Sequence, residues 1–118
     1  MTPITYISIP YTFDPELSFA ISNEIIAELS MKGEIVISVI SQFHHASFYI
    51  PKEQRFSSEF WLDIDLPILR KCDKLLVVVI GMDGHKLIAE SVGCRAEIGE
   101  AMKMQIPINY YQYEFQND

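Results

Sequence analysis

The sequence predicts a single α/β domain built on a parallel sheet, and three observations support this prediction. Segments rich in β-branched residues alternate with segments whose apolar residues recur at helical spacing, which is the order of βαβ units. The run from Leu75 to Ile80 is apolar throughout, as is typical of a strand covered on both faces. The chain has 118 residues, of which 49% are hydrophobic, so it is long enough for one domain with its own core.

The first part of the chain is expected to form a strand, a helix and a second strand. Residues Ile4 to Pro10 are β-rich and stop at a proline. Asp14 then provides a helix N-cap, and the proline after it suits the first helical turn. A helix is expected from Pro15 to Lys32, followed by Gly33 at the position of a left-handed C-terminal cap. Residues Glu34 to Ile40 predict the second strand.

The second part continues the alternation after a long connection. Residues Ser41 to Phe56 form a polar and aromatic loop, longer than usual, which indicates a functional or mobile segment. The other expected elements are a helix from Ser57 to Lys71, the strand from Leu75 to Ile80, a loop from Gly81 to Glu90, a helix from Ser91 to Met104, a strand from Ile106 to Tyr111, and a loosely held tail from Gln112 to Asp118.

This alternation predicts a three-layer, flavodoxin-like or Rossmann-like architecture, with helices on both faces of a parallel sheet in the order 2-1-3-4. Ligands of such sheets bind at the carboxyl ends of the strands where the winding reverses. Here that point lies between the first and third strands, at the loops that begin at Pro10-Tyr11 and at Gly81. The second loop leads directly into Ser91.

Charge and composition exclude several classes of function. Nine Lys and Arg against sixteen Asp and Glu give a net charge of −7, which argues against binding a nucleic acid polymer. The N-terminus lacks a signal-peptide pattern, and the longest apolar run is too short to span a bilayer, so a cytoplasmic protein without membrane association is expected. Cys72 and Cys94 have no paired spacing and are expected to be reduced core residues.

One carboxylate is expected on an apolar helix face. At helical spacing, Asp65 lies in the middle of a stripe, whereas Asp63 points the other way. A carboxylate in such a position is costly unless it is paired or kept protonated, and this marks functional sites. The alternative is that Pro67 breaks the helix and Asp65 caps the next segment. The stripe consists of Trp61, Ile64, Ile68, Leu69 and Cys72.

A second carboxylate is expected at the start of the helix from Ser91. Glu97 lies at the border of the apolar face, and Gly93 lies one turn before it. The helix start has free N–H groups that suit an anion, together with the Ser91 hydroxyl. The alternative is a solvated glutamate with Ser91 as an ordinary N-cap. Two carboxylates in one cleft favour acid/base or nucleophilic chemistry, as in the cleavage of a glycosidic bond.

Three stretches of the chain resemble the nucleoside 2-deoxyribosyltransferase superfamily. They are YISIPY from Tyr6, FWLDIDLPILRKCD from Phe60 and SVGCRAEIGEA from Ser91, and they occur in the order found in the family. The chain is most similar to a small branch with a YLxSPYS-like opening, and it also resembles the deoxynucleoside 5′-monophosphate N-glycosidases. Together the matches cover most of the expected fold.

The resemblance implies roles for individual residues. Glu97, in the pattern S-x-G-x-x-x-E, would attack the anomeric carbon and form a glycosyl-enzyme ester. Asp65, eight residues before Asp73, would handle the nucleobase, and Tyr6 would orient the nucleophile. Water or a second base would resolve the ester, so cleavage or transfer of an N-glycosidic bond is expected, with no metal and no organic cofactor.

The expected substrate is a nucleoside or its 5′-monophosphate. Ser91 and Gly93 at the helix start favour the monophosphate. The family's hydrolases, however, have a glycine- and arginine-rich loop after the first strand, where this chain has Ile9-Pro10-Tyr11-Thr12-Phe13. Pro10, Tyr11 and His44 are the other expected substrate contacts.

The resemblance also implies a homodimer or a larger homo-oligomer. Related enzymes complete each site with a neighbour's C-terminal segment, which makes Asn109 and Tyr111 candidates for that role. We expect no metal site at the histidines His44, His45 and His85. Adjacent histidines in an extended loop point to opposite sides, so His44 and His45 would not bind one metal ion together.

Two other functions stay open. A non-catalytic nucleotide-binding or protein-interaction domain on the same fold would fit the altered loop after the first strand and the long segment from residue 41 to residue 56. An N-glycosidase acting on a nicotinamide dinucleotide would use the same carboxylate in a roomier pocket.

Overall fold

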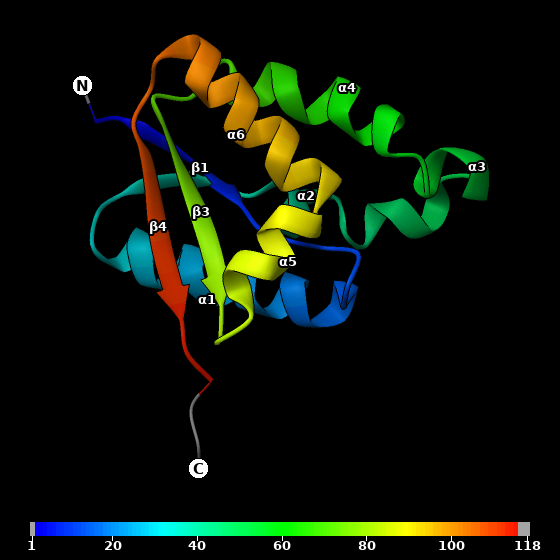
Figure 1. The fold of residues 1–118 in the computed structure, drawn as a ribbon, viewed down its shortest axis with the longest axis horizontal. Coiled ribbons are helices and arrows are strands. Elements are labelled where there is room, and N and C mark those ends of the chain that lie inside the picture. The colour runs from blue at the N-terminus through cyan, green and yellow to red at the C-terminus, as the bar shows by residue number, and fades with distance from the viewer. Residues whose placement is uncertain (1, 116–118) are drawn as a thin grey trace.

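The computed structural model describes residues 2–115 of the chain. In these residues four strands form a parallel sheet in the order β2-β1-β3-β4 (Figure 1). The central strand β1 pairs with β2 on one side and with β3 on the other. The predicted α/β class, flavodoxin-like sheet and strand order are confirmed. The strands are β1 (Ile4–Ser8), β2 (Ile35–Ile37), β3 (Lys74–Ile80) and β4 (Ile108–Tyr113).

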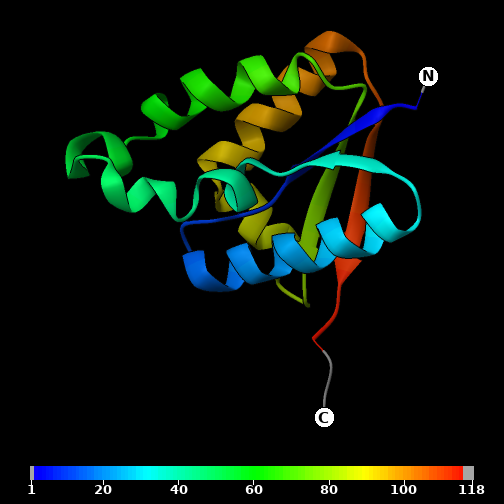
Figure 2. The ribbon, with the colours of Figure 1, turned by 180° about the vertical axis from the view of Figure 1, so that it is seen from behind.

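Helices cover both faces of the sheet, as predicted (Figures 1 and 2). On one face α1 (Pro15–Met31) packs Ile21 and Ile25 against Ile7 and Val78. On the other face the core contains Leu69, Cys94 and Ala101 against Leu75 and Val77. The helices of that face are α4 (Ser58–Leu69), α5 (Gly84–Glu90) and α6 (Val92–Met104).

The state of the two cysteines and the character of the helices can be compared with the expectations from composition. Cys72 and Cys94 are both buried and unpaired, which confirms them as core residues. Within residues 2–115, every helix falls short of the length and apolar character that a membrane crossing requires.

The segment after β2 differs from the prediction, because it is largely helical. β2 ends at Ile37, and the Ser38 hydroxyl caps the next helix by accepting a hydrogen bond from the Ser41 amide. The β-branched residues Val39 and Ile40, expected in the strand, therefore begin a helix, because this cap outweighs their strand propensity. The expected loop contains α2 (Val39–Phe43), the 3-10 helix η1 (Ala46–Tyr49) and α3 (Lys52–Arg55).

Helix α4 runs through Pro67 instead of ending there. The Ser57 hydroxyl caps its start by accepting a hydrogen bond from the Phe60 amide, and the helix continues to Leu69. Pro67 is exposed and lies in the last turn, so its missing N–H affects only the carbonyl of the exposed Asp63. The alternative in which Pro67 breaks the helix and Asp65 caps the next segment is wrong.

The C-terminal part also differs in detail. The expected loop from Gly81 to Glu90 contains α5. β4 begins at Ile108 and extends to Tyr113, whose hydroxyl donates a hydrogen bond to Glu24 of α1 at 2.6 Å. Gln112 and Tyr113 thus belong to the sheet, whereas residues 116–118 of the predicted tail lie outside the described residues.

Gly84 is the glycine most tightly enclosed by other groups. A Cβ atom there would lie 2.4 Å from Val79 Cγ1 and 2.8 Å from the Val79 carbonyl carbon. We expect Gly84→Ala to lower the free energy of unfolding by about 2 kcal/mol, because the backbone of β3 must move. The matched control is Gly99→Ala in α6, where nothing lies within 4 Å of the new methyl group. This control should raise stability by about 0.5 to 1 kcal/mol through helix propensity. Urea denaturation measures both, and equal effects would contradict the predicted contact.

Candidate active site

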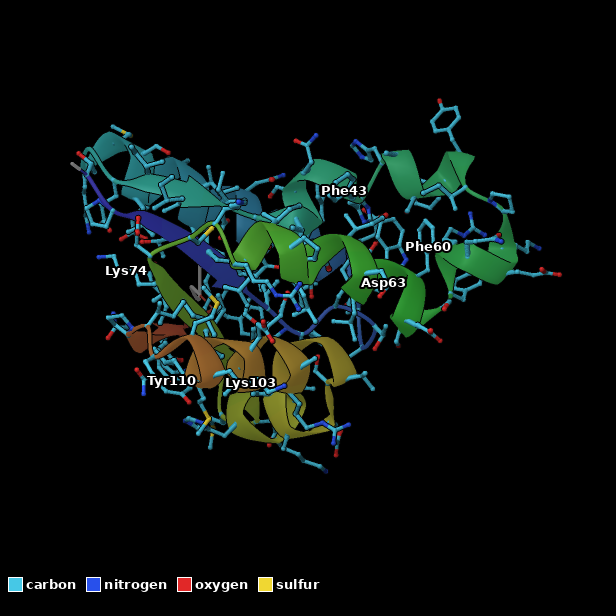
Figure 3. All side chains as sticks on the ribbon, turned by 90° about the horizontal axis from the view of Figure 1, so that it is seen from above. Phe43, Phe60, Asp63, Lys74, Lys103 and Tyr110 are labelled. Carbon is cyan, nitrogen blue, oxygen red and sulfur yellow. The ribbon has the colours of Figure 1, made fainter. Side chains whose placement is uncertain are left out.

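A cleft of about 610 Å³ opens at the carboxyl end of β1. Ile7 and Ile9 form its floor, and the start of α6 and one face of α4 form one side. Residues between β2 and α4 form the other side, with Phe43 beside Trp61 at a ring separation of 6.0 Å. In Figure 3 α4, which carries Phe60 and Asp63, runs between α6 and the segment of Phe43. Of the predicted loop from Gly81 to Glu90, only Glu90 lines this cleft.

Glu97 is a buried carboxylate at the inner end of the cleft. Only 5% of the residue is exposed, and both of its oxygens accept hydrogen bonds from side chains of β1. The Tyr6 hydroxyl donates to Oε2, and the Ser8 hydroxyl donates to Oε1 at 2.7 Å. Tyr6 and Ser8 are two residues apart in the strand, so they project from the same face of the sheet. The carboxylate is therefore fixed in one orientation by the central strand.

Asp65 lines the same cleft from α4, as predicted. Its Oδ1 atom is buried, and it has no hydrogen-bond partner among the described residues. A carboxyl group in this state is costly to keep charged. Burial accordingly raises the pKa of Asp65 to about 7. Asp65 is thus a half-buried carboxyl group with one buried oxygen that lacks a protein partner, as expected of a group that serves a ligand.

The two carboxyl groups influence each other. Burial, together with the charge of Asp65, raises the pKa of Glu97 to about 7, although the hydrogen bonds from Tyr6 and Ser8 act in the opposite direction. Those hydroxyl donors favour the ionised form of Glu97, whereas Asp65 has no such donor. Of the two ways to place one proton on the pair, these hydrogen bonds favour the one in which Glu97 is ionised and Asp65 is protonated. Burial and the neighbouring Glu97 raise the pKa of Tyr6 far above its usual range, so Tyr6 stays a donor.

Ser91, Val92 and Gly93, at the start of α6, line the cleft. The Ser91 hydroxyl accepts a hydrogen bond from the Cys94 amide at 3.1 Å, so Ser91 is the N-cap of α6. At Gly93 a Cβ atom would meet only the Ser91 hydroxyl oxygen, at 3.9 Å. No protein contact requires glycine there, and its missing side chain leaves the first turn of α6 open to a ligand.

Tyr11 and His44 meet at the cleft wall, and Glu16 joins them. The Tyr11 hydroxyl lies 2.6 Å from His44 Nδ1, and His44 Nε2 lies 3.0 Å from a carboxylate oxygen of Glu16. The His44 ring is buried and stacks on Phe19 at 4.4 Å. Because an ionised carboxylate only accepts hydrogen bonds, Nε2 of a neutral His44 carries the proton and Nδ1 accepts from Tyr11. His44 therefore positions Tyr11 and has no free ring nitrogen for a ligand.

The other predicted site residues lie away from the cleft surface. Tyr6 is completely buried behind Glu97, which suits an orienting role. Pro10 is buried, and its carbonyl accepts a hydrogen bond from Ser18 at the start of α1. Asn109 is exposed near the amino end of β4 and does not line the cleft of its own chain.

A second groove, of about 570 Å³, lies between α1 and β4 and differs chemically from the cleft. The Tyr111 hydroxyl donates to Glu28, and the Tyr113 hydroxyl donates to Glu24. These polar groups satisfy one another, whereas Asp65 in the cleft has a buried oxygen without a partner. The cleft at β1 is therefore the stronger candidate for a reactive site.

Sequence analysis missed three residues of the cleft region. Ser8 could have been found, since a polar residue two positions from Tyr6 in a buried strand must face the same layer. No local sequence pattern marked Glu16, because its partner His44 lies 28 residues away, at the end of α2. Arg55 was not marked either, because it lies in a segment that was expected to be a loop.

Comparison with known proteins identifies a family for this chain. No curated protein matches it significantly. Residues 3–113, which include all four strands and every residue of the cleft, match a family described as Domain of unknown function (DUF1937). The match spans nearly the whole chain, and the protein therefore belongs to the DUF1937 family.

Proposed function

We propose that this protein cleaves or transfers the N-glycosidic bond of a nucleoside or nucleoside 5′-monophosphate through a glycosyl ester on Glu97. The observation that carries the proposal is the pair of carboxyl groups in one cleft. Glu97 is fixed by two hydroxyl donors, and Asp65 has a buried oxygen without a partner. Glycosidases that act by a double displacement generally use two carboxyl groups whose surroundings differ.

The first step depends on the protonation of the pair. A Glu97 carboxylate oxygen attacks the anomeric carbon, and the bond between that carbon and the base nitrogen breaks. The electron pair of the broken bond passes to the base, which takes a proton from the carboxyl of Asp65. This step requires Glu97 ionised and Asp65 protonated, which is the state favoured by the hydrogen bonds of Tyr6 and Ser8.

The second step releases the sugar. Water, or a second base in the transfer reaction, attacks the anomeric carbon, and the ester bond to Glu97 breaks. The proton of the attacking group passes to the Asp65 carboxylate, which restores the starting state. Tyr6 and Ser8 stabilise the Glu97 carboxylate as it leaves, because hydrogen bonds to a charged acceptor are stronger than those to an ester.

The sequence resemblance supports these roles. In the nucleoside 2-deoxyribosyltransferase superfamily, the positions equivalent to Glu97, Asp65 and Tyr6 are the nucleophile, the base-handling acid and the orienting tyrosine. The family's oligomers also complete each site with a neighbour's C-terminal segment. A homo-oligomer in which Asn109 reaches the partner's cleft is part of the same proposal.

A panel assay tests the proposal. The wild-type protein and the Glu97→Ala variant are incubated with ribo- and deoxyribonucleosides and their 5′-monophosphates, with and without an acceptor base, and free base is measured by chromatography. We expect base release by the wild type and a loss of about 10⁴-fold or more in Glu97→Ala, since removal of a nucleophile abolishes its covalent route.

The matched control is Glu100→Ala, one turn further along α6 and outside the cleft. It should retain activity. Release of nicotinamide from a dinucleotide would identify the related N-glycosidase instead. Tight nucleotide binding without base release, unchanged in Glu97→Ala, would contradict the proposal and favour a non-catalytic binding domain.

A further inference from the structure

The cleft has a strongly one-sided charge distribution. Five carboxylate residues line it, and among the described residues Arg55 is the one lysine or arginine that does so. An anionic ligand entering such a cleft is repelled unless a cation is placed to bind it. The carboxylate residues are Asp14, Glu16, Asp65, Glu90 and Glu97.

Arg55 is held in place by its neighbours without having its charge neutralised. Its guanidinium carbon lies 4.8 Å from the ring centre of Phe56 and 5.9 Å from that of Phe48. Its backbone carbonyl accepts a hydrogen bond from the Trp61 indole at 2.7 Å, which ties α3 to α4. Aromatic rings attract the face of a guanidinium and leave the N–H groups at its edge unused.

One donor of Arg55 is left without a partner. The Nε atom is buried, yet within residues 2–115 it makes no hydrogen bond, and no carboxylate forms an ion pair with this side chain. Buried donors are normally satisfied, so an unsatisfied one in a cleft indicates a missing acceptor. A guanidinium pairs best with the oxygens of a phosphate or carboxylate, which accept two N–H bonds at once.

The place of Arg55 in the chain indicates which part of a bound ligand its side chain would reach. α3 ends at Arg55, directly before α4, and Asp65 lies seven residues into α4 from Ser58. At the rise of a helix Ser58 and Asp65 lie about 10 Å apart along α4, and Arg55 precedes Ser58 by three residues. The loop after β1 contributes Tyr11, Thr12 and Asp14 to the cleft and no cation. An anion site at that loop is therefore disfavoured, and the cation of the cleft comes instead from the segment directly before α4.

We propose that Arg55 binds an oxyanion carried by the substrate, at the end remote from the bond that Glu97 attacks. The inference rests on the proposed glycosidic activity and selects, within it, a phosphorylated substrate over an uncharged nucleoside. Phe48 and Phe56 hold the guanidinium plane, and its N–H edge binds the oxyanion.

The test compares a nucleoside with its own 5′-monophosphate. For the wild type we expect kcat/KM for the monophosphate to exceed that for the nucleoside by about tenfold to hundredfold, as for a hydrogen bond to a charged group. Arg55→Gln should remove this preference, because it should raise KM for the monophosphate much more than KM for the nucleoside. Arg55→Lys should keep only part of the preference for the monophosphate, because an ammonium group lacks the planar pair of N–H donors that a guanidinium offers to an oxyanion.

Lys52→Gln is the matched control, since it removes one positive charge from the same helix at an exposed position outside the cleft. It should retain the preference. A preference that survives in Arg55→Gln, or a wild type that cleaves both substrates equally, overturns the inference and leaves the glycosidase proposal standing.

A binding measurement separates this inference from the function on which it rests. If no compound releases base, the proposed activity fails, and titration calorimetry with the 5′-monophosphate and the nucleoside still tests Arg55. The oxyanion site is supported if the wild type binds the monophosphate more tightly than the nucleoside, and if this difference is lost in Arg55→Gln but kept in Lys52→Gln. Equal binding of the two compounds, or binding unaffected by Arg55→Gln, rules it out.

Discussion

Replacing Asp65 by asparagine is expected to slow the release of an ordinary base by about 10²- to 10⁴-fold, the contribution typical of a general acid. Asparagine keeps the shape of the side chain but cannot transfer a proton to the departing nitrogen. A guanine nucleoside methylated at N7 needs no proton, because its base departs in neutral form. For that substrate we expect Asp65→Asn to retain activity within about tenfold of the wild type. Initial rates of base release for both substrates measure the difference.

The control for this experiment is Asp63→Asn, an exposed position on the same helix outside the cleft. Neither substrate should be affected by it. Equal losses with both substrates in Asp65→Asn would mean that Asp65 positions the base without protonating it.

The second large effect concerns stability as a function of pH. Burial raises the pKa of Asp65 from 3.8 to about 7 and that of Glu97 from 4.5 to about 7. Between about pH 4 and pH 7 the folded chain therefore binds more protons than the unfolded chain, and the free energy of unfolding falls as the pH rises. The contribution of these groups is fully present below about pH 4 and is lost above about pH 7. Allowing for solvent screening at the open side of Asp65, we expect a total loss of about 2 to 4 kcal/mol.

The double variant Asp65→Asn, Glu97→Gln isolates this effect. Urea denaturation between pH 4 and pH 8 should give a nearly flat profile for the variant in that range and a falling one for the wild type. Glu28 and Glu100 titrate in the opposite sense, because hydrogen bonds from Tyr111 and Arg70 lower the pKa of each carboxyl group. Both groups are present in both proteins, so their effects cancel in the comparison. Parallel profiles would show that the two carboxyl groups are not destabilising when charged.

Much of the fold was predictable from local patterns. The apolar strand β3 and the alternation of strands and helices indicated a parallel sheet, and the order 2-1-3-4 is one of the few that right-handed crossovers allow. The segment after β2 was not predictable in the same way. Val39 and Ile40 favour strands, and a single hydroxyl, that of Ser38, starts a helix there. Likewise Pro67 suggested a break, but the break does not occur because the proline lies at the exposed end of α4.

The candidate site was predictable where the signal lay within one element. Asp65 on an apolar stripe and Gly93 one turn before Glu97 both line the cleft. Contacts between distant segments could not be derived in this way. Tyr6 is 91 residues from Glu97 in sequence, and only the resemblance to a family paired them. Ser8, Glu16 and Arg55 depend on how separate elements pack, which no spacing in the sequence encodes.

In the cleft, the proposed nucleophile and the residues proposed to select a substrate come from different parts of the fold. Glu97 is hydrogen-bonded to β1, a central strand, so the carboxylate proposed to attack the substrate is held by the core of the domain. Three aromatic residues of the cleft and the cation Arg55 come instead from residues 43–56, where only His44 and Ser47 are buried. The aromatic residues are Phe43, Phe48 and Phe56. Exchanging this segment between relatives would change which substrate is admitted without disturbing the sheet. A new specificity could thus evolve, or be engineered, on an unchanged catalytic frame.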